Sequence, residues 1–306
     1  MKSNKNHTVN ISSIGELHKS LGAKKNRHPL FSVHRYEDVS QIKVSERTTL
    51  VTELYQIALK KDCPGKLKYG QNDYDFDEGV LSFFAPNQIN ILEAGDLLPA
   101  SGWLISFHPD FLNNSSLALK IAAYGFFDYA TNEALIMSEE EENNMEGIFQ
   151  NIEKEYLLPI DNFSQEVILN NLELMFTYSN RYYNRQFITR KPFNQTLLTK
   201  VELILSEYFR TPEKQTLPSA EYIASQLNLT PRYLSDCLKQ LTGKGLQIHI
   251  HEKLIERAKQ LLGGTELTIS EIAYELGFEY PQSFHKLFKK KTGYSPLEYR
   301  TEYMYN

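Results

Sequence analysis

The sequence predicts an α+β protein: an antiparallel β-barrel with flanking helices, followed by an all-α domain of two helix-turn-helix units joined by a long helix. Two observations support this fold class. Short runs of β-branched and aromatic residues occupy the region from residue 28 to about residue 107, which is typical of an antiparallel barrel or sandwich. Residues 191–306 instead contain one helical pattern twice, which indicates a duplicated helical unit.

The clearest motif lies at residues 268–300. Thr268 and Glu271 form a T-x-x-E capping box, whose side chains can satisfy the first free amides of a helix that begins near residue 269. Gly277 suits a left-handed stop after that short helix. Pro281 suits the first turn of the next helix, because proline has no amide to lose there. The segment therefore predicts a helix-turn-helix unit.

The second helix of this motif has an apolar face and a polar, basic face. The outward residues are Gln282, Ser283, His285, Lys286, Lys289 and Lys290. Short polar and basic side chains at the start of such a helix can contact base edges in the DNA major groove. Gln282 suits adenine, and Lys286 suits guanine or a phosphate. A small helical hairpin with a solvated basic face would give the same pattern, so one copy does not separate the two interpretations.

An earlier segment repeats this motif. Ile223-Ala224 matches Ile272-Ala273, and Thr242-Gly243 matches Thr292-Gly293 after one extra residue in the later turn. Between the copies, residues 246–262 place apolar side chains on a helical period. At about 1.5 Å per residue such a helix measures roughly 25 Å. It is a suitable spacer for two recognition helices in successive major grooves, whose centres lie about 34 Å apart.

The paired motifs, the connecting helix and the closing stretch TGYSPLEYR resemble the DNA-binding domain of AraC-type transcription regulators, the arabinose-regulator family. The resemblance implies two sets of DNA contacts. The first helix would contribute Arg232, Ser235, Asp236 and Lys239, and the second Gln282, Ser283, His285 and Lys286. Asp236 departs from the basic residue often found at its position. An acid can accept from a cytosine amino group, but it repels phosphate.

The charge differs between the two parts of the chain. Residues 191–306 carry 15 Lys and Arg against 13 Asp and Glu, whereas residues 1–190 carry 18 against 25. The sign of this asymmetry suits a C-terminal domain that binds DNA. Because the excess is small, attraction to phosphate must come from local clusters such as Lys289-Lys290-Lys291 rather than from a uniform field.

Four segments are predicted along the chain. They are a polar N-terminal segment (1–27), a β-barrel (28–112), a helical dimerisation region (113–190) and the double helix-turn-helix domain (191–306). The second segment resembles the cupin-like barrel that many AraC-type regulators carry, most closely at GWLISFHPDFL, residues 102–112. Cupin enzymes hold a metal with clustered histidines and a carboxylate. His28, His34 and His108 are isolated in the sequence, so we expect neither a metal nor a cofactor.

Aromatic residues of the barrel segment indicate either a packed core or the wall of a small-molecule cavity. The candidates for contact with an effector are Tyr55, Tyr69, Phe83 and Trp103. Their abundance is also what any small barrel needs to fill its interior, so both interpretations stay open. No basic cluster in this segment marks a site for a phosphate or a carboxylate.

Two longer helices are expected after the barrel. Ser138 and Glu141 form a capping box before a helix that reaches about residue 156, and a second helix runs from about residue 163 to residue 187. Its apolar stripe comprises Val167, Ile168, Leu172, Met175, Ser179 and Tyr182. The length of this stripe favours a homodimer through the 163–187 helix over packing on the protein's own sheet. Arg190-Lys191-Pro192 is the predicted linker to the last domain.

The sequence also bears on location. No apolar run approaches the roughly 20 residues that span a bilayer, and MKSNKNHTVN lacks an apolar signal core, so we expect a cytoplasmic protein without membrane contact. Cys63 and Cys237 fall in different predicted domains. They are expected to be ordinary thiols rather than a disulfide.

Three functions fit these patterns. The first is a sequence-specific DNA-binding transcription regulator that is dimeric, is controlled by a small-molecule effector in the barrel, and acts on RNA polymerase. The second is a cupin-type metal-dependent enzyme with an accessory helical domain, for which the sequence offers no metal-ligand set. The third is an adaptor whose helical repeats bind protein. Binding to duplex DNA that weakens steeply with salt would separate the first function from the others.

Overall fold

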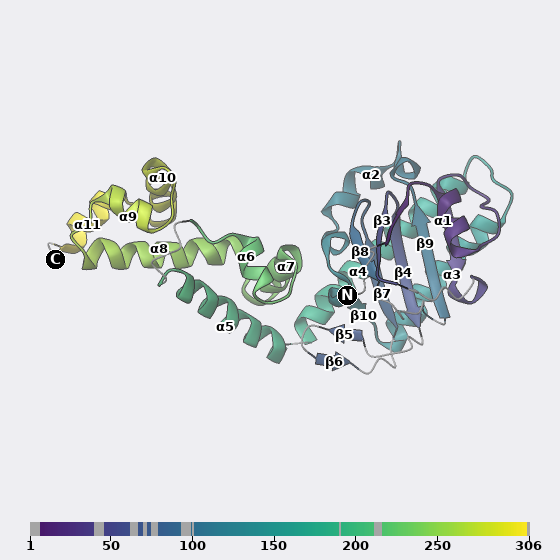
Figure 1. The fold of residues 1–306 in the computed structure, drawn as a ribbon, viewed down its shortest axis with the longest axis horizontal. Coiled ribbons are helices and arrows are strands. Elements are labelled where there is room, and N and C mark those ends of the chain that lie inside the picture. The colour runs from purple at the N-terminus through teal and green to yellow at the C-terminus, as the bar shows by residue number, and fades with distance from the viewer. Residues whose placement is uncertain are drawn as a thin grey trace, which may run out of the picture. The chain divides into compact units, whose positions relative to one another are not determined.

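The computed structural model describes residues 7–39, 46–61, 67–69, 72–74, 79–92, 99, 101–189, 191–210 and 216–304. The chain divides into two units, residues 1–186 and residues 187–306, whose elements are labelled in Figure 1. The first unit combines strands and helices, and the second contains helices only. The predicted α+β class with a helical C-terminal domain is therefore confirmed.

The N-terminal unit combines α-helices with β-sheets of different sizes. The strands are β1 (His7–Ile11), β2 (Phe31–Arg35), β3 (Thr48–Thr52), β4 (Tyr55–Lys61), β5 (Leu67–Tyr69), β6 (Asn72–Tyr74), β7 (Val80–Phe84), β8 (Ile89–Leu92), β9 (Ser101–Phe107) and β10 (Leu135–Ile136). The α-helices are α1 (Ile14–Leu21), α2 (Ser116–Lys120), α3 (Glu139–Leu157) and α4 (Ser164–Thr189). One sheet has the order β10-β7-β4-β9-β2, a second has the order β1-β3-β8, and β5 pairs with β6.

The predicted barrel does not close within the described residues. β10 and β2 are the edges of the five-stranded sheet, and β1 and β8 are the edges of the three-stranded sheet. In addition, β1 pairs with β3 in parallel, although antiparallel pairing was expected throughout. This strand lies in the segment predicted to be merely polar, because Val9 and Ile11 are its only apolar residues and give a weak period-two signal. Likeness to the cupin-like barrel stays a prediction.

The five-stranded sheet buries both of its faces. Because successive residues of a strand point to opposite sides, one face presents Phe83 and Trp103 to the helices. Phe83 contacts Phe176 of α4, and Trp103 stacks on Phe149 of α3 at 5.9 Å between ring centroids. The opposite face contributes to a core that includes residues of α1, β1 and β3. The helices and the smaller sheet therefore cover the larger sheet from its two sides.

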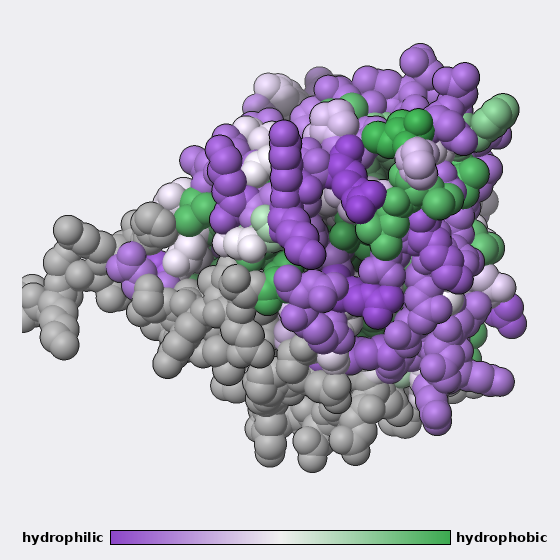
Figure 2. Space-filling view, turned by 90° about the vertical axis from the view of Figure 1, so that its right-hand side faces the viewer, coloured by the Kyte–Doolittle hydropathy of each residue, from purple (hydrophilic) through white to green (hydrophobic). Residues whose placement is uncertain are grey.

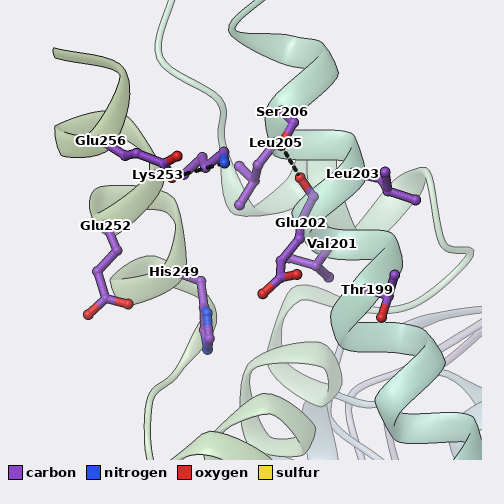
Figure 3. Close-up of a pocket in the computed structure, with 10 residues that line it drawn as sticks. All are labelled: Thr199, Val201, Glu202, Leu203, Leu205, Ser206, His249, Glu252, Lys253 and Glu256. Atoms are coloured by element: carbon purple, nitrogen blue, oxygen red, sulfur yellow. Dashed lines mark hydrogen bonds and ion pairs between the residues drawn. The ribbon is translucent and has the colours of Figure 1, made fainter. Parts of the chain in front are cut away.

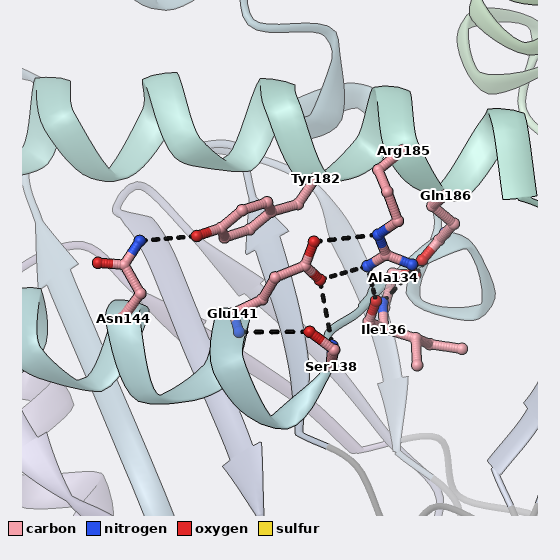
Figure 4. Close-up of polar contacts among 8 residues, drawn as sticks. All are labelled: Ala134, Ile136, Ser138, Glu141, Asn144, Tyr182, Arg185 and Gln186. Carbon is pink, nitrogen blue, oxygen red and sulfur yellow. Dashed lines mark hydrogen bonds and ion pairs between the residues drawn. The ribbon is translucent and has the colours of Figure 1, made fainter.

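Polar contacts fasten the second half of α4 to α3 and β10 (Figure 4). Ser138 and Glu141 cap the start of α3 reciprocally, as predicted. The Glu141 carboxylate also accepts from the guanidinium of Arg185, which donates to the carbonyl of Ile136 at 2.8 Å. Gln186 accepts from the amide of Ile136, also at 2.8 Å. One carboxylate thus serves as helix cap and ion-pair partner, and it holds α4 against its own unit.

The C-terminal unit contains the two predicted helix-turn-helix pairs. Its helices are α5 (Lys191–Tyr208), α6 (Ala220–Ser225), α7 (Pro231–Thr242), α8 (Leu246–Gly264), α9 (Ile269–Glu275), α10 (Pro281–Thr292) and α11 (Pro296–Met304). The predicted linker differs, because Lys191 and Pro192 begin α5, while Arg190 lies outside the described residues. Proline is tolerated in the first turn of a helix, where its missing amide would have no partner within the helix.

Gly277 fixes the turn between α9 and α10. Its φ of +89° lies in the left-handed region, and an added Cβ would stand 2.4 Å from the carbonyl carbon of Thr216. Gly293 follows α10 with a φ of +85°, but an added Cβ there would meet no described atom within 4 Å. Both glycines have the same backbone conformation, and only the first is also crowded by another segment.

We expect Gly277→Ala to lower the melting temperature of the full chain more than Gly293→Ala does. Each substitution places alanine in the left-handed region at a cost of about 1–2 kcal/mol. Only Gly277→Ala must also displace the backbone at Thr216. Scanning calorimetry of the two variants beside the unmodified chain measures the difference. Equal losses would contradict the close approach of Thr216 to this turn.

Candidate nucleic-acid interface

Helix α10 presents an uninterrupted polar and basic surface. Phe284 and Phe288 on its opposite side are fully buried, in a core shared with α8, α9 and α11. All predicted contact residues of this helix are exposed, namely Gln282, Ser283, His285, Lys286, Lys289 and Lys290. The sequence of α10, PQSFHKLFKKKT, has no Asp or Glu. Its outer surface therefore carries only neutral and positive side chains.

The positive charge is concentrated at the end of α10. Lys289, Lys290 and Lys291 occupy its last turn, where cations interact favourably with the helix dipole. Their field reaches the neighbouring helix α8. Burial, followed by the charges of Lys291 and Lys290, lowers the pKa of His251 below its ordinary value. A local cluster of this kind is what attraction to phosphate requires in a domain with little net charge.

Helix α7 has a different surface. Arg232 and Lys239 are exposed, and the Nε atom of Arg232 donates to Oδ2 of Asp236 at 3.1 Å. The hydroxyl of Ser235 accepts from the amide of Leu246 at 3.3 Å. It is thus engaged at the start of α8 instead of facing outward. The structure brings Arg232 and Asp236 together, leaves Lys239 exposed, and gives Ser235 a contact within the domain.

Cys237 lies on the inner side of α7 and is fully buried. Burial raises the pKa of its thiol to about 12, so the group is protonated and unreactive in the folded domain. Cys63 lies outside the described residues. Cys237 behaves as the ordinary buried thiol that its sequence context predicts.

A groove of about 470 Å³ between α5 and α8 has the opposite charge character (Figure 3). Its walls include Glu202, Glu252 and Glu256, and Lys253 donates to Glu256 at 2.9 Å. None of the predicted contact residues lines this groove. Its carboxylates would repel phosphate, so it is not part of the candidate interface.

The aromatic candidates for an effector belong to a packed core. Tyr55 stacks on Phe107 at 5.2 Å, Phe83 contacts Phe126 at 4.2 Å, and Trp103 contacts α3. Tyr69 ends β5, but its side chain lies outside the described part of the chain. The three described residues face the helices, which is the packed-core interpretation of the pattern. Their contact with an effector stays a prediction.

The other face of this sheet carries buried polar side chains that the sequence analysis missed. Ser32 is the register partner of Ser106, which is also the partner of Gln56. Gln56 donates to the Ser106 hydroxyl at 3.3 Å. The buried hydroxyls of Ser32 and Ser82 have no hydrogen-bond partner among the described residues, which costs about 1–3 kcal/mol each. Polar residues alternating with apolar ones in the strands were the overlooked signal.

Two histidines meet between β2 and α1. The Nε2 atoms of His34 and His18 are 3.1 Å apart, and Nδ1 of His18 donates to the carbonyl of Lys24 at 2.5 Å. One of the two Nε2 atoms must donate to the other. Burial, and then the charge of His18, lowers the pKa of His34 to about 4. Within the described residues, no group of three His, Cys, Asp or Glu is placed to hold a metal ion.

We expect the chain to lose stability as pH falls from about 6.5 towards about 4. The folded pKa of His34 is about 4, below the value of about 6.5 for an unfolded histidine. The unfolded chain therefore binds the proton first, and the stabilisation present above the unfolded pKa is lost across this window. Urea unfolding at several pH values tests this expectation. His34→Leu should flatten the dependence, and an unchanged slope would exclude His34 as its source.

No helix among the described residues has the length and apolar character to cross a membrane. A family model for a helix-turn-helix domain matches residues 223–302, which run from α6 into α11. The duplicated units and this match define a helix-turn-helix domain in the C-terminal unit. Within that class, the matched part of the chain is an AraC-type domain, as the sequence resemblance implies.

Two similar proteins are named as HTH-type transcriptional regulators. The chain is 35% identical over 83 residues to the HTH-type transcriptional regulator YijO of Escherichia coli, covering 27% of this chain and 29% of that protein. It is 33% identical over 78 residues to the HTH-type transcriptional activator RhaS of Escherichia coli, covering 26% and 28%. The chain thus spans less than a third of these two relatives.

A solved structure also matches part of the chain. It is the C-terminal domain of the two-component response regulator yesN from Fusobacterium nucleatum, with 32% identity and a TM-score of 0.29. The match covers 33% of this chain and 93% of that domain.

Proposed function

We propose that this protein is a sequence-specific DNA-binding transcription regulator. The surface of α10 is the observation that supports this function most directly. Its exposed side is polar and basic, while Phe284 and Phe288 fix its other side in the core. A recognition helix needs this division, because its N-terminal turns must reach base edges while the scaffold holds its axis. Phosphates would be contacted mainly by the lysines of the last turn.

Helix α8 supports the use of both helix-turn-helix units. It runs from Leu246 to Gly264, and at about 1.5 Å per residue it measures about 28 Å. This length approaches the separation of about 34 Å between successive major grooves. Arg232 and Gln282 are both exposed, as a pair of recognition helices requires. With α8 as a rigid spacer, α7 and α10 can therefore contact successive major grooves of one duplex.

Control by a small molecule is part of this proposal. The buried hydroxyls of Ser32 and Ser82 supply unused hydrogen-bonding groups between the two sheets, which suits a polar effector better than the packed aromatic face does. A cytoplasmic location and a contact with RNA polymerase follow from the function of a transcription regulator.

A homodimer through α4 would have to use Val167 of the predicted stripe together with exposed residues outside that stripe. Ile168 and Leu172 of the predicted stripe are buried within their own unit, because the sheet and α3 hide this side of the helix. Phe163, Val167 and Leu174 remain 67%, 39% and 45% exposed, and their spacing places them on one side of α4. Figure 2 shows hydrophobic side chains gathered within an otherwise largely hydrophilic surface of the N-terminal unit.

We expect Leu174→Glu to convert a dimer into a monomer, because a charge would be buried in the apolar contact between the two α4 helices. Sedimentation velocity of the full chain measures the change. Ile89→Glu is the matched control, since Ile89 is 66% exposed on β8 and away from this contact. A monomeric unmodified chain, or equal effects of the two variants, would contradict the proposed interface.

We expect Lys286→Ala and Lys290→Ala to weaken DNA binding in different ways. If Lys286 contacts a base, its loss should cost roughly 1–3 kcal/mol on the selected duplex and less on a scrambled one. Lys290→Ala should weaken binding to both duplexes alike. It should also reduce the slope of log affinity against log salt concentration by about the amount that one phosphate contact contributes. Fluorescence anisotropy at several salt concentrations measures both effects.

Lys19→Ala serves as a control for these two variants, because Lys19 is an exposed lysine of α1 in the other unit. It should leave both duplexes bound as before. If Lys286→Ala and Lys290→Ala behave alike on cognate and scrambled DNA, Lys286 does not contribute to sequence recognition. Binding that is insensitive to salt would speak against a DNA interface on α10.

A further inference from the structure

We infer that Asp236 is a positioning residue that aims the guanidinium of Arg232 at a guanine, so that the first helix-turn-helix unit recognises a G·C base pair. The inference rests on the proposed function, since it assigns a role within the same DNA-binding surface. It differs from the expectation that Asp236 itself contacts a cytosine. The two roles lead to different outcomes at individual base pairs.

The ion pair between Arg232 and Asp236 uses Nε of Arg232 and leaves the two terminal nitrogens of its guanidinium on the side away from Asp236. Nε of Arg232 donates to Oδ2 of Asp236 at 3.1 Å, with the side chains 47% and 29% exposed. No other contact of Arg232 is described. Its two Nη groups can therefore act as parallel donors, which is the arrangement that matches O6 and N7 of guanine. Arg232 also lies directly after Pro231, in the first turn of α7, where recognition helices contact base edges.

Helix stability does not explain this pair. An acid followed four residues later by a base is the favourable order in a helix, whereas Arg232 precedes Asp236. A cation in the first turn also opposes the helix dipole, and exposed ion pairs contribute little to folding. What the pair does provide is a fixed direction for a long, flexible side chain. A fixed guanidinium loses less conformational entropy when it meets a base.

The second unit shows the contrast. Lys286 occupies the position in α10 that corresponds to Asp236, and the sequence of α10 has no acid. In α7 the carboxylate offsets the charge of Arg232, so this helix attracts phosphate less. Removing the carboxylate should therefore strengthen binding to any duplex while it weakens the preference for guanine. A purely structural role would not produce these two opposite changes.

The test is a binding selection from a pool of randomised DNA duplexes, in which the bound duplexes are sequenced. The selection is carried out with the full chain in four forms: the unmodified protein, Arg232→Ala, Arg232→Lys and Asp236→Asn. Arg232→Ala should abolish the guanine preference at one base pair. Arg232→Lys should weaken it, because lysine lacks the planar pair of donors. Asp236→Asn should lower the preference at that same base pair by about tenfold and raise the affinity for random duplex at low salt. Gln282→Ala, on α10, should leave this base pair unaffected.

Each alternative outcome is distinguishable. An effect of Asp236→Asn at a different base pair from that of Arg232→Ala would show that Asp236 contacts a base itself, and would overturn the inference. An enriched motif that Arg232→Ala leaves unchanged would also overturn it, while the proposed function would stand. If the unmodified chain enriches no motif, the proposed function fails and the inference fails with it. Thermal melting of each variant confirms that loss of preference is not loss of folding.

Discussion

Burial of one side of α7 and of α10 is the constraint on which the C-terminal unit depends. Phe284 and Phe288 of α10 pack against α8 residues such as Leu254 and Leu261. A fully buried phenylalanine contributes about 1.5–3 kcal/mol relative to an exposed one, so rotating α10 about its axis would be costly. The outward direction of Gln282 and Lys286 follows from that cost. The hydrophobic core therefore determines which side chains of α10 face outward, and these are the ones proposed to contact DNA.

Local chemistry explains which elements were predictable from the sequence. The capping box of Thr268 and Glu271 is present as predicted, and Gly277 and Pro281 mark the turn as expected. Each of these signals acts within a few residues, so no knowledge of distant partners is needed. The parallel pairing of β1 with β3 depends on residues far apart in the chain. The strand sequences do not encode that choice in any local pattern.

At the candidate interface, too, the local features were predictable from the sequence and the long-range contacts were not. Exposure of the α10 residues follows from helical periodicity, because Phe284 and Phe288 fix the buried side. The contact of Ser235 with the amide of Leu246 could not be foreseen, since it depends on how α7 meets the next helix. For the same reason, the stripe on α4 was expected to form an interface between subunits although Leu172 is buried within its own unit. A pattern shows that a face is apolar, but it does not show what covers it.

The buried thiol of Cys237 has a practical consequence for the study of this chain. Because Cys237 lies on the inner side of α7, a thiol reagent can reach it only when α7 separates from its neighbours. The rate of alkylation at this position, followed by peptide mass spectrometry, would then report how often the helix opens. The protein contains a natural probe of local unfolding at the surface where DNA is proposed to bind.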